Sequence, residues 1–126
     1  MQLTEVIQFQ TVYNTLAEAK LPFKVAYKLN KLYEESQKEA EWYNKEFSSI
    51  LNEYGKKDEE GDFIHTSDGL AIKIQEGRES ECQAKIQELA QVDVELKSPK
   101  LTMDDLSVID AELTVREVAI LMNFIE

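Results

Sequence analysis

Apolar residues recur at helical spacing over a long stretch that begins after Pro22 and ends before Gly55. Successive members of this stripe are three or four residues apart, with a mean step near the 3.6-residue repeat of a straight α-helix. Proline is tolerated in the first turn of a helix, and glycine favours the left-handed conformation that often ends one. The pattern therefore predicts one helix of about 32 residues. The stripe comprises Val25, Leu29, Leu32, Ser36, Ala40, Tyr43, Phe47, Ile50 and Tyr54.

A shorter apolar pattern lies upstream and predicts a first helix from about Thr4 to Ala19. The link that ends at Pro22 is short, and proline disfavours the helical conformation in the residue before it. Two helices joined by so short a link are usually antiparallel neighbours, so residues 1–54 are expected to form a helical hairpin. The buried face of the first helix comprises Val6, Phe9, Tyr13 and Leu16.

The long helix is expected to exceed what one compact chain can cover. At 1.5 Å per residue it spans about 48 Å, whereas a compact chain of 126 residues has a radius of gyration of about 14 Å. The first helix reaches only about half of it, so the remaining apolar residues need cover from elsewhere. We therefore predict a homo-oligomer, with these interface residues on the far half of the long helix and near the C-terminal end: Trp42, Tyr43, Phe47, Ile50, Met122 and Phe124.

After Gly55 the apolar period changes from 3.6 to 2. A polar loop leads to residues 62–66, then to an Asp-Gly pair at 68–69, and then to a strictly alternating run over 70–75. Asp-Gly between two such runs is a strong hairpin signal. We expect a β-hairpin with one buried face, formed by Leu70, Ile72 and Ile74.

A third helix and a further strand are predicted next. The helix spans about residues 78–91, with Cys82, Ile86 and Leu89 facing inward. Residues 92–96 alternate again and are expected to add a third strand through a right-handed crossover.

Two capping signals lie near the C-terminal end of the sequence. Thr102 with Asp105, and Thr114 with Glu117, have the spacing of capping boxes. The second signal predicts a last helix over residues 115–125. Its expected buried stripe comprises Val115, Val118, Leu121, Met122 and Ile125.

These elements predict an α+β fold in a single domain of residues 1–126. A long antiparallel helical hairpin over residues 1–54 precedes the part from 55 to 126. That part is expected to hold a small three-stranded sheet with a covering helix and a C-terminal helix.

Charge narrows the classes of partner. The chain has 14 Lys and Arg against 25 Asp and Glu, a net charge of −11, most of it after residue 54. An acidic surface repels the phosphate backbone, so direct nucleic-acid binding is not expected, whereas a basic protein partner is favoured. Solubility alone is the simpler explanation of the same charge and needs no partner.

The sequence also bears on location. No basic and apolar leader precedes the first helix, and no apolar run is long enough to span a membrane. The single cysteine suits a reducing compartment. We therefore expect a cytoplasmic protein without membrane contact.

No catalytic or metal-binding set stands out. The chain has one histidine, His65, and one cysteine, Cys82. A nucleophile needs a base within reach, and a zinc site needs more His and Cys than the chain holds. Cys82 occupies an apolar helix position, which is typical of a structural cysteine. We expect no enzyme activity, no metal and no cofactor.

A basic stripe marks the start of the long helix. Lys20, Lys24, Lys28 and Lys31 recur at steps of four, four and three, with Tyr27 beside them. The stripe is either a solvated face or a site for a phosphate or an acidic partner, to which an arginine would add bidentate contacts. The candidate binding residues are Lys24, Tyr27, Lys28, Lys31, Arg78 and Arg116.

The segment 20–29, with its Leu-Pro-x-Lys-x-x-Tyr motif, resembles an uncharacterised family of small phage and prophage proteins. The Lys-, Asp- and Glu-rich loop over 54–61 and the apolar last helix over 115–125 extend the likeness along most of the chain. The resemblance implies a phage accessory protein made in the cytoplasm of an infected bacterium. It implies no catalytic residue and no mechanism.

The leading functional hypothesis is a non-enzymatic phage accessory protein that binds and blocks or sequesters a host immune component, either a protein or a nucleotide signal. The alternative is a structural or assembly component of the virion or tail. A third hypothesis, an enzyme, would depend on His65 or Cys82.

Overall fold

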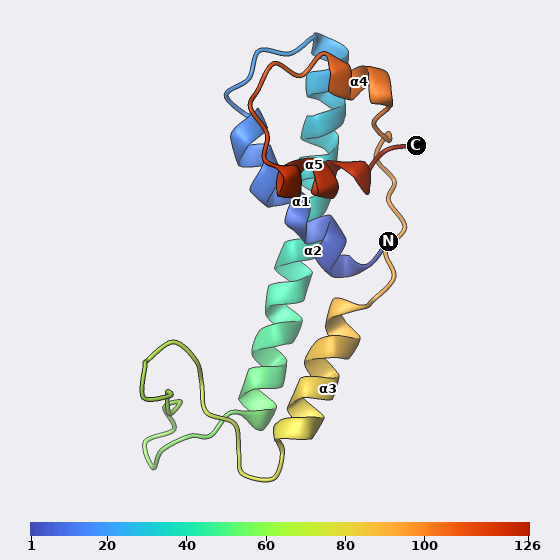
Figure 1. Ribbon diagram of the computed structural model, residues 1–126. Coiled ribbons are helices and arrows are strands. Elements are labelled where there is room, and N and C mark those ends of the chain that lie inside the picture. Colours follow the sequence, from blue (N-terminus) through green and yellow to red (C-terminus); the bar gives the residue numbers. More distant parts are fainter. The chain divides into compact units, whose positions relative to one another are not determined.

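The computed structural model describes residues 1–126 and contains five helices. Helices hold 56% of the residues, 8% lie in strands or bridges, and no sheet is present. The predicted α+β class with a three-stranded sheet is therefore wrong, and the protein is mainly helical. The helices (Figure 1) are α1 (Leu3–Leu16), α2 (Phe23–Tyr54), α3 (Glu79–Ala90), α4 (Met103–Ser107) and α5 (Val115–Met122).

The chain divides into two compact units. Unit 1 comprises residues 1–41 and 93–126, and unit 2 comprises residues 42–92. The boundary therefore lies inside α2, after Glu41. The first part of α2 contributes to unit 1, and the remainder contributes to unit 2.

The predicted bounds of the long helix are confirmed, but the predicted conformation of Gly55, the residue after it, is wrong. α2 begins after Pro22 and runs unbroken to Tyr54, a length of 32 residues. Gly55 is not in the left-handed conformation that the prediction assumed. A side chain would not fit at this position, because a Cβ there would lie 2.5 Å from the Leu51 carbonyl oxygen and 2.7 Å from the Phe63 ring.

The core of unit 1 is built from α1, α5 and the first part of α2. α1 packs against α5 (Figure 1), and the Phe9 and Phe124 ring centroids are 5.1 Å apart. Tyr13 of α1 stacks on Tyr33 of α2 with centroids 3.9 Å apart, so the two helices touch in unit 1, whereas α1 makes its main helix contact with α5. The buried cluster comprises Phe9, Val12, Leu16, Val25, Leu29, Leu32, Leu101, Ile120, Leu121 and Phe124.

Both predicted capping boxes are confirmed. The Thr102 hydroxyl accepts a hydrogen bond from the Asp105 N–H at 3.1 Å, at the start of α4. The Thr114 hydroxyl accepts one from the Glu117 N–H at 3.1 Å, at the start of α5. Each side chain thereby satisfies a backbone donor that the first turn of a helix leaves unpaired.

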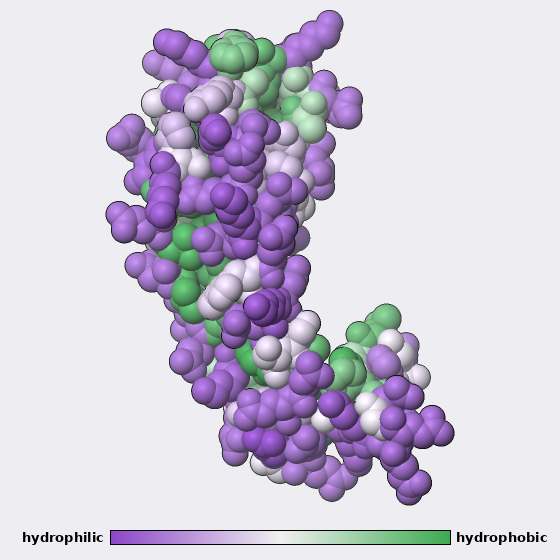
Figure 2. All heavy atoms as spheres, turned by 180° about the vertical axis from the view of Figure 1, so that it is seen from behind, coloured by the Kyte–Doolittle hydropathy of each residue, from purple (hydrophilic) through white to green (hydrophobic).

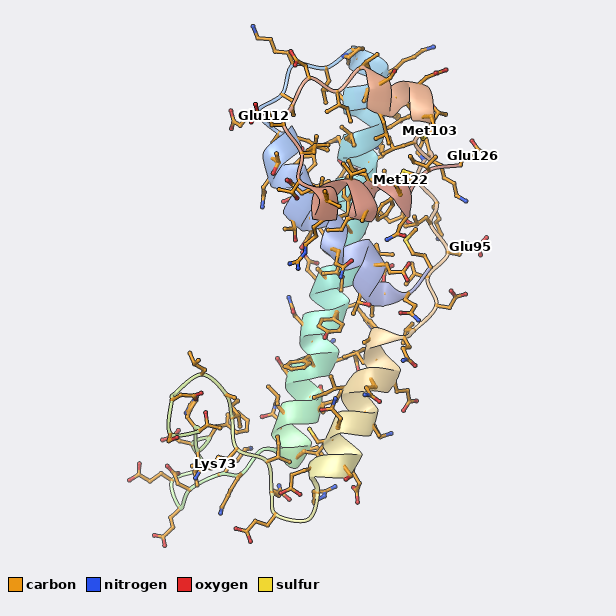
Figure 3. All side chains as sticks on the ribbon, viewed as in Figure 1. Lys73, Glu95, Met103, Glu112, Met122 and Glu126 are labelled. Atoms are coloured by element: carbon orange, nitrogen blue, oxygen red, sulfur yellow. The ribbon has the colours of Figure 1, made fainter.

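The predicted buried stripe of the last helix is largely wrong. Val115 is 89% exposed and Met122, labelled in Figure 3, is 48% exposed, whereas Phe124 is only 1% exposed. The helix ends early, at Met122, and the Leu101 N–H donates to the Phe124 carbonyl oxygen at 3.0 Å. The residues after α5 therefore lie in the core of unit 1, and the face of α5 that turns inward carries Ile120 and Leu121.

Unit 2 contains the predicted turn and hairpin, but the two arms of the hairpin are joined by isolated β-bridges and do not form continuous strands. The Thr66 N–H donates to the Ala71 carbonyl and the Lys73 N–H to the Ile64 carbonyl, both at 2.8 Å. Gly69 in the turn has a φ of 74°, the left-handed conformation that this loop needs. α3 follows as predicted, with Cys82 and Leu89 buried and Ile86 half-buried.

The third predicted strand pairs elsewhere. Residues 92–96 do not join the hairpin, since the Val94 N–H donates to the Met1 carbonyl oxygen at 2.7 Å within unit 1. The place beside the hairpin is taken by the residues that follow α2, which bridge to Ile74. Alternation predicts which face of a strand is buried but not which segment lies next to it, and this is why the sheet prediction failed.

Candidate functional site

Three of the predicted binding residues lie together at the start of α2. Lys24, Tyr27 and Lys28 line an open cavity of about 440 Å³ together with Phe23 and Pro99. Phe23 is 84% exposed and Tyr27 is 50% exposed. We call these five residues the aromatic–lysine platform, and all of them belong to unit 1.

A carboxylate on α2 holds one side of the platform in place. Glu35 accepts hydrogen bonds from the Lys97 N–H at 2.8 Å, the Ser98 N–H at 2.9 Å and the Ser98 hydroxyl. Partial burial raises the pKa of Glu35, but these hydrogen bonds together outweigh burial and hold the pKa below its ordinary value. The ionised Glu35 therefore fixes the backbone directly before Pro99.

A second carboxylate neutralises one of the lysines. Asp105 of α4 accepts from the Lys28 ammonium at 2.7 Å and from the Thr102 N–H at 2.9 Å. The hydrogen bond from Lys28 is the main reason that the pKa of Asp105 is lowered. Lys24, by contrast, takes part in none of the ion pairs of the structure, so it supplies the uncompensated positive charge of the platform.

A fourth predicted residue lies next to the platform. The Lys31 ammonium is 5.6 Å from the centroid of the Tyr27 ring and 3.6 Å from a carboxylate oxygen of Glu34. The start of α2 therefore brings together four of the six predicted binding residues.

The two arginines are not brought to the platform by any contact in the structure. Arg78 belongs to unit 2, where its guanidinium lies 4.3 Å from the centroid of the Tyr54 ring and 3.4 Å from Glu81. These contacts make it a structural residue at the end of α2. Arg116 lies exposed on α5 in unit 1.

Unit 2 contains a second candidate site, which the sequence did not predict. An open and mostly apolar cavity of about 590 Å³ is lined by the hairpin, by α3 and by the C-terminal part of α2. We call it the hairpin groove. Figure 2 shows hydrophobic surface over the hairpin. The apolar residues that line the groove are Phe47, Leu51, Leu70, Ala71, Ile72, Ile74, Cys82 and Ile86.

The hairpin face was predicted to be buried, and this is wrong. Leu70 is 87% exposed, and Ile72 and Ile74 are only half-buried. The alternating pattern did place Leu70, Ile72 and Ile74 on one face, because all three line the groove. It could not show that too few apolar residues pack against that face to cover it, because the sequence does not state how much cover each segment receives.

Three titratable side chains are among the residues that line the groove. His65 and Cys82 both line it, together with Glu79. Burial raises the pKa of the Cys82 thiol, which keeps it protonated and weakly nucleophilic. The structure contains no group of three or more side chains that could hold a metal ion.

Of the predicted interface residues, one lies in the core and five reach the surface. Phe124 is buried within unit 1 and is not available to a second chain. Trp42 is 44% exposed, and the Tyr43 and Phe47 rings stack at 5.9 Å, both half-buried. Ile50 is also half-buried, and Met122 is exposed. The homo-oligomer itself stays a prediction.

None of the helices combines the length and apolar character needed to cross a membrane. Comparison of the chain with models of protein families, with curated proteins and with solved structures finds no match.

Proposed function

We propose that this protein is a non-enzymatic binding protein that captures a partner protein in the hairpin groove. In the setting implied by the resemblance, it is a phage accessory protein that blocks or sequesters a component of host immunity. The observation that carries the proposal is Leu70, a large apolar side chain 87% exposed at the edge of an apolar cavity. Such surface is costly to leave in water and marks interaction sites.

Charge defines the partner more closely. Unit 2 carries six Lys and Arg against eleven Asp and Glu. Lys56, Arg78 and Lys85 are already ion-paired within the unit. Asp68 adjoins the groove, and its hydrogen bonds from the Thr66 hydroxyl and the Leu70 N–H lower its pKa and keep it ionised. The partner segment that fits is apolar, with lysines or arginines beside it.

The proposal is tested by one substitution with a matched control. Leu70→Ser removes the exposed apolar group of unit 2, and Val115→Ser removes a similarly exposed one, 89% against 87%, from unit 1. Bacterial strains that each carry one immune system are made to express the wild-type chain or a variant, and phage plating is counted. We expect the wild-type chain and Val115→Ser to restore plating on at least one strain, and Leu70→Ser to lose at least about tenfold.

Two results would overturn the proposal. Restoration of plating by Leu70→Ser at the wild-type level would show that the groove is not used. Recovery of the protein from purified phage particles at a stoichiometric copy number would favour a structural component of the virion instead. Once a partner is identified, its affinity is expected to fall as salt rises from about 50 to about 300 mM, because screening weakens the contact between acidic and basic surfaces.

A further inference from the structure

The aromatic–lysine platform lies in unit 1 and has a different chemistry from the hairpin groove. Its two aromatic residues, Phe23 and Tyr27, are one helical turn apart on α2, and Phe23 is largely exposed whereas Tyr27 is half exposed. Pro99 borders the same cavity, held there by the hydrogen bonds of Glu35 to the preceding residue. These exposed rings and the fixed proline form an apolar surface outside the buried core.

The charge of the platform is opposite to that of the whole protein. The chain has a net charge of −11, yet residues 23–31 of α2 hold three lysines and no acid. Asp105 pairs with Lys28, and Glu34 pairs with Lys31. Lys24 is left without a carboxylate partner, next to Phe23 in sequence and one turn before Lys28. The platform therefore combines ring surface with at least one free ammonium.

We propose that the aromatic–lysine platform binds a nucleotide. The base would stack on the Phe23 and Tyr27 rings, and the phosphates would contact the ammonium groups of Lys24 and Lys28. Stacking on aromatic side chains tolerates any base, and a lysine contacts phosphate as a point charge. The cavity of about 440 Å³ lies within the range of roughly 300–1,000 Å³ that is usual for small-ligand sites. A long nucleic acid is disfavoured because the remaining surface is acidic.

The test uses the full chain labelled with ¹⁵N and titrated with ATP, with inorganic triphosphate and with adenosine. We expect ATP to shift the amide signals of residues 23–28 and to move the Phe23 and Tyr27 ring signals upfield. Each partial ligand is expected to bind more weakly than ATP, because each lacks one of the two contacts.

Three variants distinguish stacking of the base from contact of the phosphates with lysine. Phe23→Ser is expected to weaken ATP binding about tenfold, as for the loss of one stacking ring. Lys24→Gln is expected to weaken it about fivefold. Lys45→Gln is the matched control, because Lys45 is another exposed lysine of α2 but belongs to unit 2, and it is expected to leave binding unchanged.

Three outcomes would overturn the proposal. The first is the absence of any shift at residues 23–28 with ATP in large excess over the protein. The second is equal binding of ATP and triphosphate with no effect of Phe23→Ser, which would indicate charge attraction alone. The third is much tighter binding of a ten-nucleotide single strand than of ATP, which would assign the platform to nucleic acid. None of these variants alters the hairpin groove, so failure here is distinguishable from failure of the proposed function.

Discussion

The two units of this protein share one helix but use its apolar stripe differently. Of the fifteen buried hydrophobic residues, twelve belong to unit 1 and three, Tyr54, Cys82 and Leu89, belong to unit 2. In unit 1 the stripe of α2 is covered by α1 and by the residues around α5. In unit 2 the same stripe continues through Tyr43, Phe47 and Ile50, which are only half-buried.

This difference teaches that regular apolar spacing does not by itself guarantee a core. Burial of apolar area is the main favourable term in folding, so unit 1 has far more stabilisation available than unit 2. Unit 2 depends more on local features, such as the close approach at Gly55 and the contacts of Arg78 on Tyr54. Apolar surface that unit 2 does not bury remains available to a partner.

The largest effect is expected from the core of unit 1. Phe9→Ala removes a fully buried ring that meets Phe124. We expect it to lower the free energy of unfolding by about 3–5 kcal/mol, because the cavity is enclosed on all sides. Urea unfolding followed by circular dichroism gives the change.

Truncation of a buried residue of unit 2 to alanine is expected to cost less than the truncation in unit 1. Leu89→Ala truncates a residue that is 7% exposed. We expect a loss near the low end of the range of about 2–5 kcal/mol, because solvent lies close to the site. A loss for Leu89→Ala as large as that for Phe9→Ala would contradict the stated difference between the units.

A smaller effect is expected at the end of α2. Gly55→Ala places a Cβ against the Leu51 carbonyl and the Phe63 ring, and we expect a loss of about 1.5–2 kcal/mol from overpacking. Gly69→Ala is the matched control, since nothing lies within 4 Å of its Cβ position and only its φ of 74° is unfavourable. That control is expected to cost about 1 kcal/mol. Thermal unfolding of both variants ranks them, and the reverse order would contradict the requirement for space at Gly55.

Glu35 gives a pH-dependent effect in unit 1. Its pKa in the folded state is depressed below the ordinary value of about 4.3, so its stabilisation is present above that value and is lost as the pH falls through the depressed pKa. Glu35→Gln is expected to cost about 1 kcal/mol at neutral pH and less at lower pH. Urea unfolding at several pH values measures both. A loss that stays constant down to pH 3 would rule out a role for the carboxylate charge.

The smallest effect on stability is expected in the hairpin groove. Leu70 is 87% exposed, so Leu70→Ser should change the free energy of unfolding by no more than about 0.5 kcal/mol. A greater loss, measured by urea unfolding, would show that Leu70 packs within unit 2 and would remove the basis for a docking groove.

Much of the local structure could be predicted from the sequence. The 3.6-residue repeat gave the bounds of α2, the threonine and acid pairs gave both capping boxes, and Asp68-Gly69 gave the turn. Four of the six predicted binding residues meet at the start of α2, because helical spacing alone places them there. Each of these features depends on residues only a few positions apart.

The failures all concern contacts between distant segments. The sheet was wrong because residues 92–96 pair with the N-terminal segment, and the face of α5 was wrong because Phe124, which is hydrogen-bonded to Leu101, lies in the core. The hairpin groove could not be seen because the sequence does not state how much apolar cover each segment receives.

The sequence by itself determined where the helices begin, where α2 ends, where the chain turns and which positions are apolar, because steric and hydrogen-bonding preferences act over a few residues. Only the tertiary structure decided which apolar positions are buried, since burial depends on the partner that each segment finds. In unit 1 the apolar stripe of α2 is covered by other segments, whereas in unit 2 the hairpin remains open to solvent.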